Sequence, residues 1–125
     1  MVFDDVKKED LFLKGLVEYN SKNFYDAHEY WEDLWSDYKL EEPDIIQGLI
    51  QVSVGFFHLT NLNKKGSIGL FNKSIKKLTP YNNSKNLPID ISLIISEVEK
   101  MLNWLEVNDN LKEFDWADFK KIDIK

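Results

Sequence analysis

The chain has 125 residues, 43 % of them hydrophobic, a formal net charge of −6 and no cysteine. This length predicts one domain that buries a sizeable core without help from a metal or a disulfide. The lack of cysteine excludes a disulfide framework, a thiol nucleophile and any cysteine-ligated zinc or iron–sulfur site. The acidic balance repels phosphate backbones and anionic lipid surfaces, so it disfavours nucleic acid and membranes as partners.

The first ten residues are acidic and contain no apolar segment, which predicts that no secretory signal is present. The longest apolar stretch, residues 45–59, is interrupted by Gln47, Gln51 and His58. It also falls short of the ~20 residues that a membrane span needs. Together with the lack of cysteine, this pattern predicts a cytoplasmic protein with no membrane contact.

The helical period of 3.6 residues dominates, and no internal repeat is visible in the sequence. A first helix is predicted over residues 7–19. Asn23 then caps a second helix over residues 24–38. The apolar stripe of this second helix is predicted to comprise Phe24, Ala27, Trp31, Trp35 and Tyr38.

A third helix is predicted over residues 43–62, with Pro43 in its first turn. It is apolar nearly all round, so we expect it to lie in the centre of the molecule. A fourth helix is predicted over residues 67–78, and Pro80 ends it. Its inward face comprises Ile68, Phe71, Ile75 and Leu78.

Asp90 is the expected N-cap of a fifth helix that runs to about residue 107. The segment after it carries Leu111, Phe114, Trp116 and Phe119, too many large apolar groups for a free tail, so we expect it to dock on the body or on another subunit. Leu93 and Trp104 lie off the apolar stripe of the fifth helix. Either the tail covers them or they form a self-association surface.

The predicted fold over residues 1–125 is therefore a single all-α domain. It is a compact bundle of about five helices with the third helix buried at its centre, and the fifth helix and docked tail occupy residues 90–125.

Polar side chains recur on the second and third helices at spacings that place them near one another. His28 falls within the apolar stripe of the second helix, and Glu32 follows one turn later. On the third helix, Gln47, Gln51 and His58 share one azimuth. Because buried polar groups are costly unless they are paired, we expect these five side chains to form one buried cluster, next to Trp35.

Three interpretations of this cluster remain open. It fixes the register of the two helices by hydrogen bonding among its own members. Alternatively it forms a small-molecule or divalent-metal site in which His28, Glu32 and His58 are the candidate metal ligands and catalytic groups. In the third interpretation the two polar stripes do not meet. The sequence requires no cofactor.

Sharper motifs fail on their spacing. The segment from His28 to Glu32 has a Glu where a zincin helix needs its second His. Neither histidine has the Glu three residues before it that a di-iron bundle needs, because those positions are Tyr25 and Gly55. A lysine face on the fourth helix lacks interleaved aromatic residues, which indicates an ordinary solvated surface rather than a nucleic-acid site. It comprises Lys65, Lys73, Lys76 and Lys77.

The pattern His-x-x-x-Glu-x-x-Trp, here His28, Glu32 and Trp35, resembles the signature of the family called domain of unknown function 309. The lead-in at Gly15, the Gln47–Gln51 segment and His58 also fit, and the resemblance covers about residues 10–81. It implies an all-α bundle and highlights the same polar residues, but it implies no activity. We therefore expect an interaction or assembly module, with a homo-oligomer or another protein as partner. The alternative is a metal- or small-molecule-binding enzyme that uses His28, Glu32 and His58.

Overall fold

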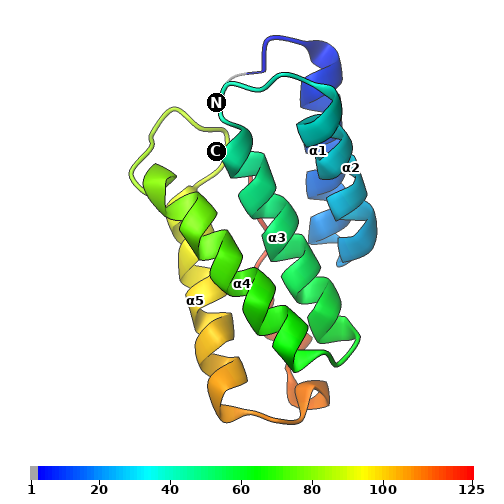
Figure 1. The fold of residues 1–125 in the computed structure, drawn as a ribbon, viewed down its shortest axis with the longest axis vertical. Helices are drawn as coiled ribbons and strands as arrows, with labels where there is room; N and C mark the ends of the chain where they lie inside the picture. The colour runs from blue at the N-terminus through cyan, green and yellow to red at the C-terminus, as the bar shows by residue number, and fades with distance from the viewer. Residues whose placement is uncertain (1–2) are drawn as a thin grey trace.

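The computed structural model describes residues 3–125, and within them every regular element is helical (Figure 1). The five α-helices are α1 (Val6–Asn20), α2 (Phe24–Asp37), α3 (Pro43–Thr60), α4 (Lys64–Leu78) and α5 (Ile91–Val107). Three short 3-10 helices follow α4 and α5, at Thr79–Tyr81, Leu111–Glu113 and Trp116–Asp118. The prediction of an all-α bundle of about five helices is confirmed.

The helix at the centre of the bundle is α3, with α1 and α2 on one side and α4 and α5 on the other (Figure 1). Eleven of its 18 residues are buried. Pro43 stands in its first turn, where the missing N–H removes no helical hydrogen bond. An apolar surface on nearly all sides suits a helix that other helices surround, so the expected central position of this helix is confirmed.

Two helical hairpins, α1–α2 and α3–α4, are built alike with an offset of 40 residues. In the first, Gly15 lies against Trp31, and a Cβ added at Gly15 would stand 2.2 Å from the indole Nε1. In the second, Gly55 lies against Phe71, and an added Cβ would stand 2.7 Å from the ring. Both aromatic rings are fully buried. Each hairpin is therefore closed by a glycine on its first helix and a large ring on its second.

The turns of the two hairpins also match. Lys22 and Leu62 both have a left-handed backbone, with φ of 66° and 59°. The N–H of the asparagine that follows each of them, Asn23 or Asn63, donates back to the carbonyl of residue 18 or 58, at 2.9 and 2.8 Å. The two hairpins thus share one structural plan although no repeat is visible in the sequence, because few of the paired positions keep the same residue.

Two helical faces differ from the prediction. On α2, Leu34 is fully buried and Trp35 is 43 % exposed, because the packing of Trp31 on Gly15 rotates the apolar face away from Trp35. On α4, Ser67 and Ser74 are buried, and their hydroxyls donate to main-chain carbonyls at 2.9 and 2.7 Å. This helix also begins at Lys64, earlier than predicted, because the side chain of Asn63 caps it by accepting from the Gly66 N–H.

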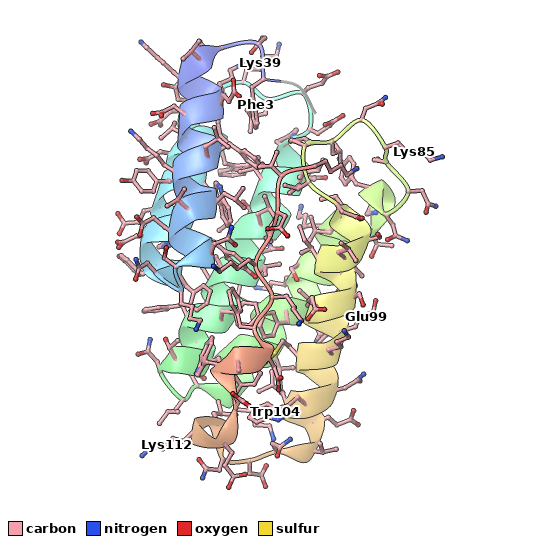
Figure 2. The ribbon with its side chains drawn as sticks, turned by 180° about the vertical axis from the view of Figure 1, so that it is seen from behind. Phe3, Lys39, Lys85, Glu99, Trp104 and Lys112 are labelled. Carbon is pink, nitrogen blue, oxygen red and sulfur yellow. The ribbon has the colours of Figure 1, made fainter. Side chains whose placement is uncertain are left out.

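After α5 the chain turns back and runs between α1 and α5 (Figure 2). Leu111, Phe114 and Ile122 of this tail are buried. Of the two places predicted for the tail, the structure shows docking on the body of the same chain. Within residues 3–125, none of the helices combines the length and the apolar character needed to cross a bilayer.

Candidate functional site

The predicted site residues of α2 lie on one edge of that helix. The Nε2 atom of His28 stands 3.4 Å from Oε2 of Glu32, one turn further along. The other ring nitrogen, Nδ1, lies 2.5 Å from the carbonyl oxygen of Tyr25. The His28 side chain is 18 % exposed, whereas the Glu32 side chain is 58 % exposed. The pair therefore stands at the surface, with the imidazole inward and the carboxylate in solvent.

His58 lies in the last turn of α3, next to the connection to α4. Its Nδ1 atom is 3.4 Å from the side-chain nitrogen of Asn63. Its ring packs so closely on Gly66 that a Cβ added there would stand 2.9 Å from Cγ of His58. This histidine is therefore held by the turn that begins α4.

Aromatic rings connect the two histidines across the helices. Tyr25 stands 4.8 Å from the ring of His28 and 5.4 Å from the ring of Phe57, centroid to centroid. Phe57 in turn lies 6.2 Å from the ring of His58. We call His28, Tyr25, Phe57 and His58 the ring row. Sequence reasoning missed Tyr25 and Phe57, although both are large aromatics just off the buried stripes of their helices.

The structure corrects the prediction of one buried, hydrogen-bonded cluster. Within residues 3–125, no hydrogen bond joins His28 or Glu32 to the polar stripe of α3. Gln51 is buried, and its Oε1 makes no hydrogen bond. Gly48 and Gly55, three residues before it and four after it, both pack on side chains of α4. The face of α3 that carries Gln51 is thus turned toward α4, away from the pair on α2.

The three candidate metal ligands are not assembled as one centre. In the described part of the chain, no group of three or more histidine or carboxylate side chains is placed to hold a metal ion. His28 and Glu32 stand together, while the polar neighbour of His58 is Asn63. Gln47, the remaining predicted member, is half-buried on α3.

The helix that carries Tyr25 and His28 of the ring row is acidic. The helix α2 carries five carboxylates and no lysine or arginine, namely Asp26, Glu29, Glu32, Asp33 and Asp37. Tyr25 and Trp35 present aromatic surface among them, with exposures of 52 % and 43 %. Rings beside carboxylates attract cationic side chains, both through the negative face of the ring and by direct charge. Of the predicted lysine face of α4, Lys77 pairs with Asp44 at 3.5 Å, and Lys65 precedes Gly66, on which His58 packs.

The fold and the site define a small bundle of helical hairpins with an aromatic and acidic surface. Residues 12–70 match the family model described as "Domain of unknown function (DUF309)". This match confirms the resemblance predicted from His28, Glu32 and Trp35, and it spans the whole ring row. It ends within α4, so α5 and the tail lie outside it. No curated protein matches the chain.

Proposed function

We propose that this protein is an interaction module that binds basic segments of partner proteins through the ring row and the carboxylates of α2. The observation that carries the proposal is the continuous contact of four rings across α2 and α3, next to Glu32. Tyr25, at the middle of the row, is half-exposed. Its ring therefore offers a partner contact area that the core does not use.

The chemistry of this surface selects the partner. A lysine or arginine over an aromatic face gains roughly 0.5–2 kcal/mol, depending on how far it is desolvated. The carboxylates of α2 add long-range attraction, which raises the association rate of a basic segment. An acidic or phosphate-bearing partner is repelled by the same negative charges, in keeping with the overall charge of −6.

The alternative of an enzyme built on His28, Glu32 and His58 receives less support from the geometry. The two histidines are separated by Tyr25 and Phe57 rather than facing a common space. A homo-oligomer formed through Trp104 and the tail also receives less support, because Trp104 packs on Phe114 of the same chain at 5.3 Å. Both remain predictions.

The proposal can be tested by titrating the ¹⁵N-labelled full chain with a synthetic amphipathic peptide of leucine and lysine. We expect chemical-shift changes at the amides of the ring row and of Glu32. Raising the salt concentration to about 0.5 M should weaken the binding, because exposed charges are then largely screened. The same peptide with glutamate in place of lysine should cause no shifts on α2.

Two matched variants sharpen the test. Tyr25→Ala removes a half-exposed ring from the row and should weaken binding about five- to thirty-fold, as expected for an aromatic anchor worth about 1–2 kcal/mol. Val17→Ala shortens an exposed apolar side chain on α1 and should leave binding unchanged. Equal binding of the acidic peptide, or shifts confined to another surface, would contradict the proposal.

A further inference from the structure

A second surface, the groove between α1 and α5, is already occupied by the chain's own tail. Residues 115–125 run between α1 and α5, as Figure 2 shows from behind. The chain leaves its last helical turn at Phe119, whose backbone is extended, with φ of −66° and ψ of 128°. No helix is assigned from there to residue 125. The groove thus holds an extended peptide.

Asn20 recognises the main chain of this peptide. Its Nδ2 donates to the carbonyl of Ile122 at 2.9 Å, and its Oδ1 accepts from the N–H of the same residue at 2.8 Å. A side-chain amide can bond both the N–H and the carbonyl of one residue only when the backbone of that residue is extended. These two hydrogen bonds do not depend on the side chain of that residue. This contact therefore fits any extended segment, whatever its residue at that position.

The groove also selects an aromatic side chain three residues earlier. Phe119 stands 5.2–5.5 Å from the rings of Tyr19, Phe24 and Phe56, which come from three different helices. Ile122 is buried, whereas Lys120 and Lys121 between the two anchors are exposed. The pattern that the groove reads is an aromatic residue, two variable residues and then an aliphatic residue.

The tail leaves part of the groove unfilled. A cavity of about 290 Å³ remains between the tail and α5. Its walls include Tyr19, Ile94, Glu97, Val98 and Met101, with Lys120 and Lys121 of the tail on the other side. Apolar wall atoms that face water in this cavity would be stabilised if a larger apolar side chain covered them. A different peptide, with a larger apolar group facing α5, would therefore fill the groove better than the tail does.

Beyond Phe119 the tail is held by few contacts. Among residues 120–125 only Ile122 is buried, and besides the two bonds with Asn20 the main chain is held by the Lys125 N–H, which donates to the carbonyl of Pro88 at 2.8 Å. A segment with few buried contacts opens locally at a free energy well below that of global unfolding. We propose that the groove between α1 and α5 is a binding site for an extended segment of another protein, with an aromatic residue three positions before an aliphatic one, and that such a segment displaces the tail. This site does not use the ring row and stands independently of the function proposed above.

The test is trans binding of a labelled peptide to full-length chains. Ile122→Pro removes the N–H that donates a hydrogen bond to Oδ1 of Asn20. The tail then binds the groove more weakly and competes less with the peptide, while the groove itself is unchanged. A fluorescein-labelled peptide with the sequence of residues 114–125 should bind this variant about five- to tenfold more tightly than the unmodified chain, the effect of losing one hydrogen bond. Adding Asn20→Ala to Ile122→Pro should abolish this gain.

Controls separate groove binding from unfolding. Asp123→Pro adds a proline at a position whose N–H donates no hydrogen bond within residues 3–125, and it should bind the peptide as the unmodified chain does. A peptide with alanine at the position of Phe119 should not bind. No saturable binding to Ile122→Pro would overturn the proposal, and so would a stable dimer of the unmodified chain formed by exchange of tails.

Hydrogen exchange keeps the proposal testable even where Ile122→Pro fails to fold. In the unmodified chain, the amide of Ile122 should exchange at least tenfold faster than the amides of α3, because it is released by local opening. Exchange of Ile122 at the rate of global unfolding would show that the tail is an integral part of the core. That result would overturn the proposal.

Discussion

Gly15 and Trp31 meet without any space for a side chain between them, since a Cβ at Gly15 would stand 2.2 Å from the indole Nε1. The indole cannot swing aside freely, because its N–H donates to the buried carbonyl of Phe12 at 3.1 Å. Gly15→Ala should therefore lower the free energy of unfolding by about 2–4 kcal/mol, through overpacking and the loss of that hydrogen bond. Urea denaturation of the variant measures the change.

The repeat provides the controls for this prediction. Gly55→Ala should destabilise less than Gly15→Ala, because Phe71 has no polar group to leave unpaired. Gly69 has no atom within 4 Å of its added Cβ, so Gly69→Ala should be neutral or stabilising by about 0.5–1 kcal/mol, the difference in helix propensity. Equal effects of all three substitutions would contradict the role assigned to the two hairpin glycines.

These glycines also explain how far the sequence predicts the fold. Periodicity alone identifies all five helices, the Asp90 cap and the central position of α3, because each depends on local pattern. The rotation of α2 is not local. It follows from the fit of Trp31 on Gly15, two residues in different helices, which turns Leu34 inward and Trp35 outward. The repeat is equally hidden, since Trp31 and Phe71 share only their size.

The sequence predicts only part of the candidate site, since it points to the two histidines and Glu32 but not to Tyr25, Phe57 or the geometry. The sequence identifies His28 and Glu32 as a pair, and the structure places them 3.4 Å apart. It cannot show that Gln51 faces α4, because that direction depends on the packing of Gly48 and Gly55 on α4. The sequence gives no sign that Asn20 binds the tail, since its partner Ile122 lies 102 residues away.

A buried hydroxyl joins α2 to α3 and should matter for stability. Ser53 is fully buried, and its Oγ donates to the carbonyl of Phe24 at 2.6 Å. Ser53→Ala should lower the free energy of unfolding by about 1–2 kcal/mol, because it leaves a buried carbonyl without this donor. The exposed Ser96, on α5, provides a matched control, and Ser96→Ala should change stability by less than about 0.5 kcal/mol. A thermal melt of both variants decides between the outcomes.

Divalent metal ions separate the interaction module from the metal-dependent alternative. We expect zinc or nickel at about tenfold molar excess to raise the melting temperature by no more than about 1 °C, because one histidine and one carboxylate on α2 form a weak site. The comparison is between the unmodified chain and His28→Ala. A clear rise that His28→Ala removes would favour the metal-binding alternative over the proposed function.

Alkaline pH should destabilise the protein through one tyrosine. Burial raises the pKa of Tyr19 above its ordinary value, and the nearby charge of Glu97 raises it further. The folded state therefore holds the phenol proton at a pH where the unfolded chain has released it. Stability from this group is complete below about pH 10, the ordinary tyrosine pKa, and falls as pH rises above it by up to about 1.4 kcal/mol per pH unit.

Tyr19→Phe isolates this contribution, because phenylalanine keeps the ring that contacts Phe24, Phe56 and Phe119 but has no proton to lose. Urea denaturation between about pH 8 and pH 11 should show a smaller loss of stability in this variant than in the unmodified chain. Identical pH profiles for Tyr19→Phe and the unmodified chain would mean that the Tyr19 hydroxyl ionises freely in the folded protein.

Tyr19 also lines the cavity beside the tail. If the loss of stability with rising pH becomes smaller when Ile122→Pro weakens the tail, the Tyr19 hydroxyl reaches solvent through the space that the tail covers.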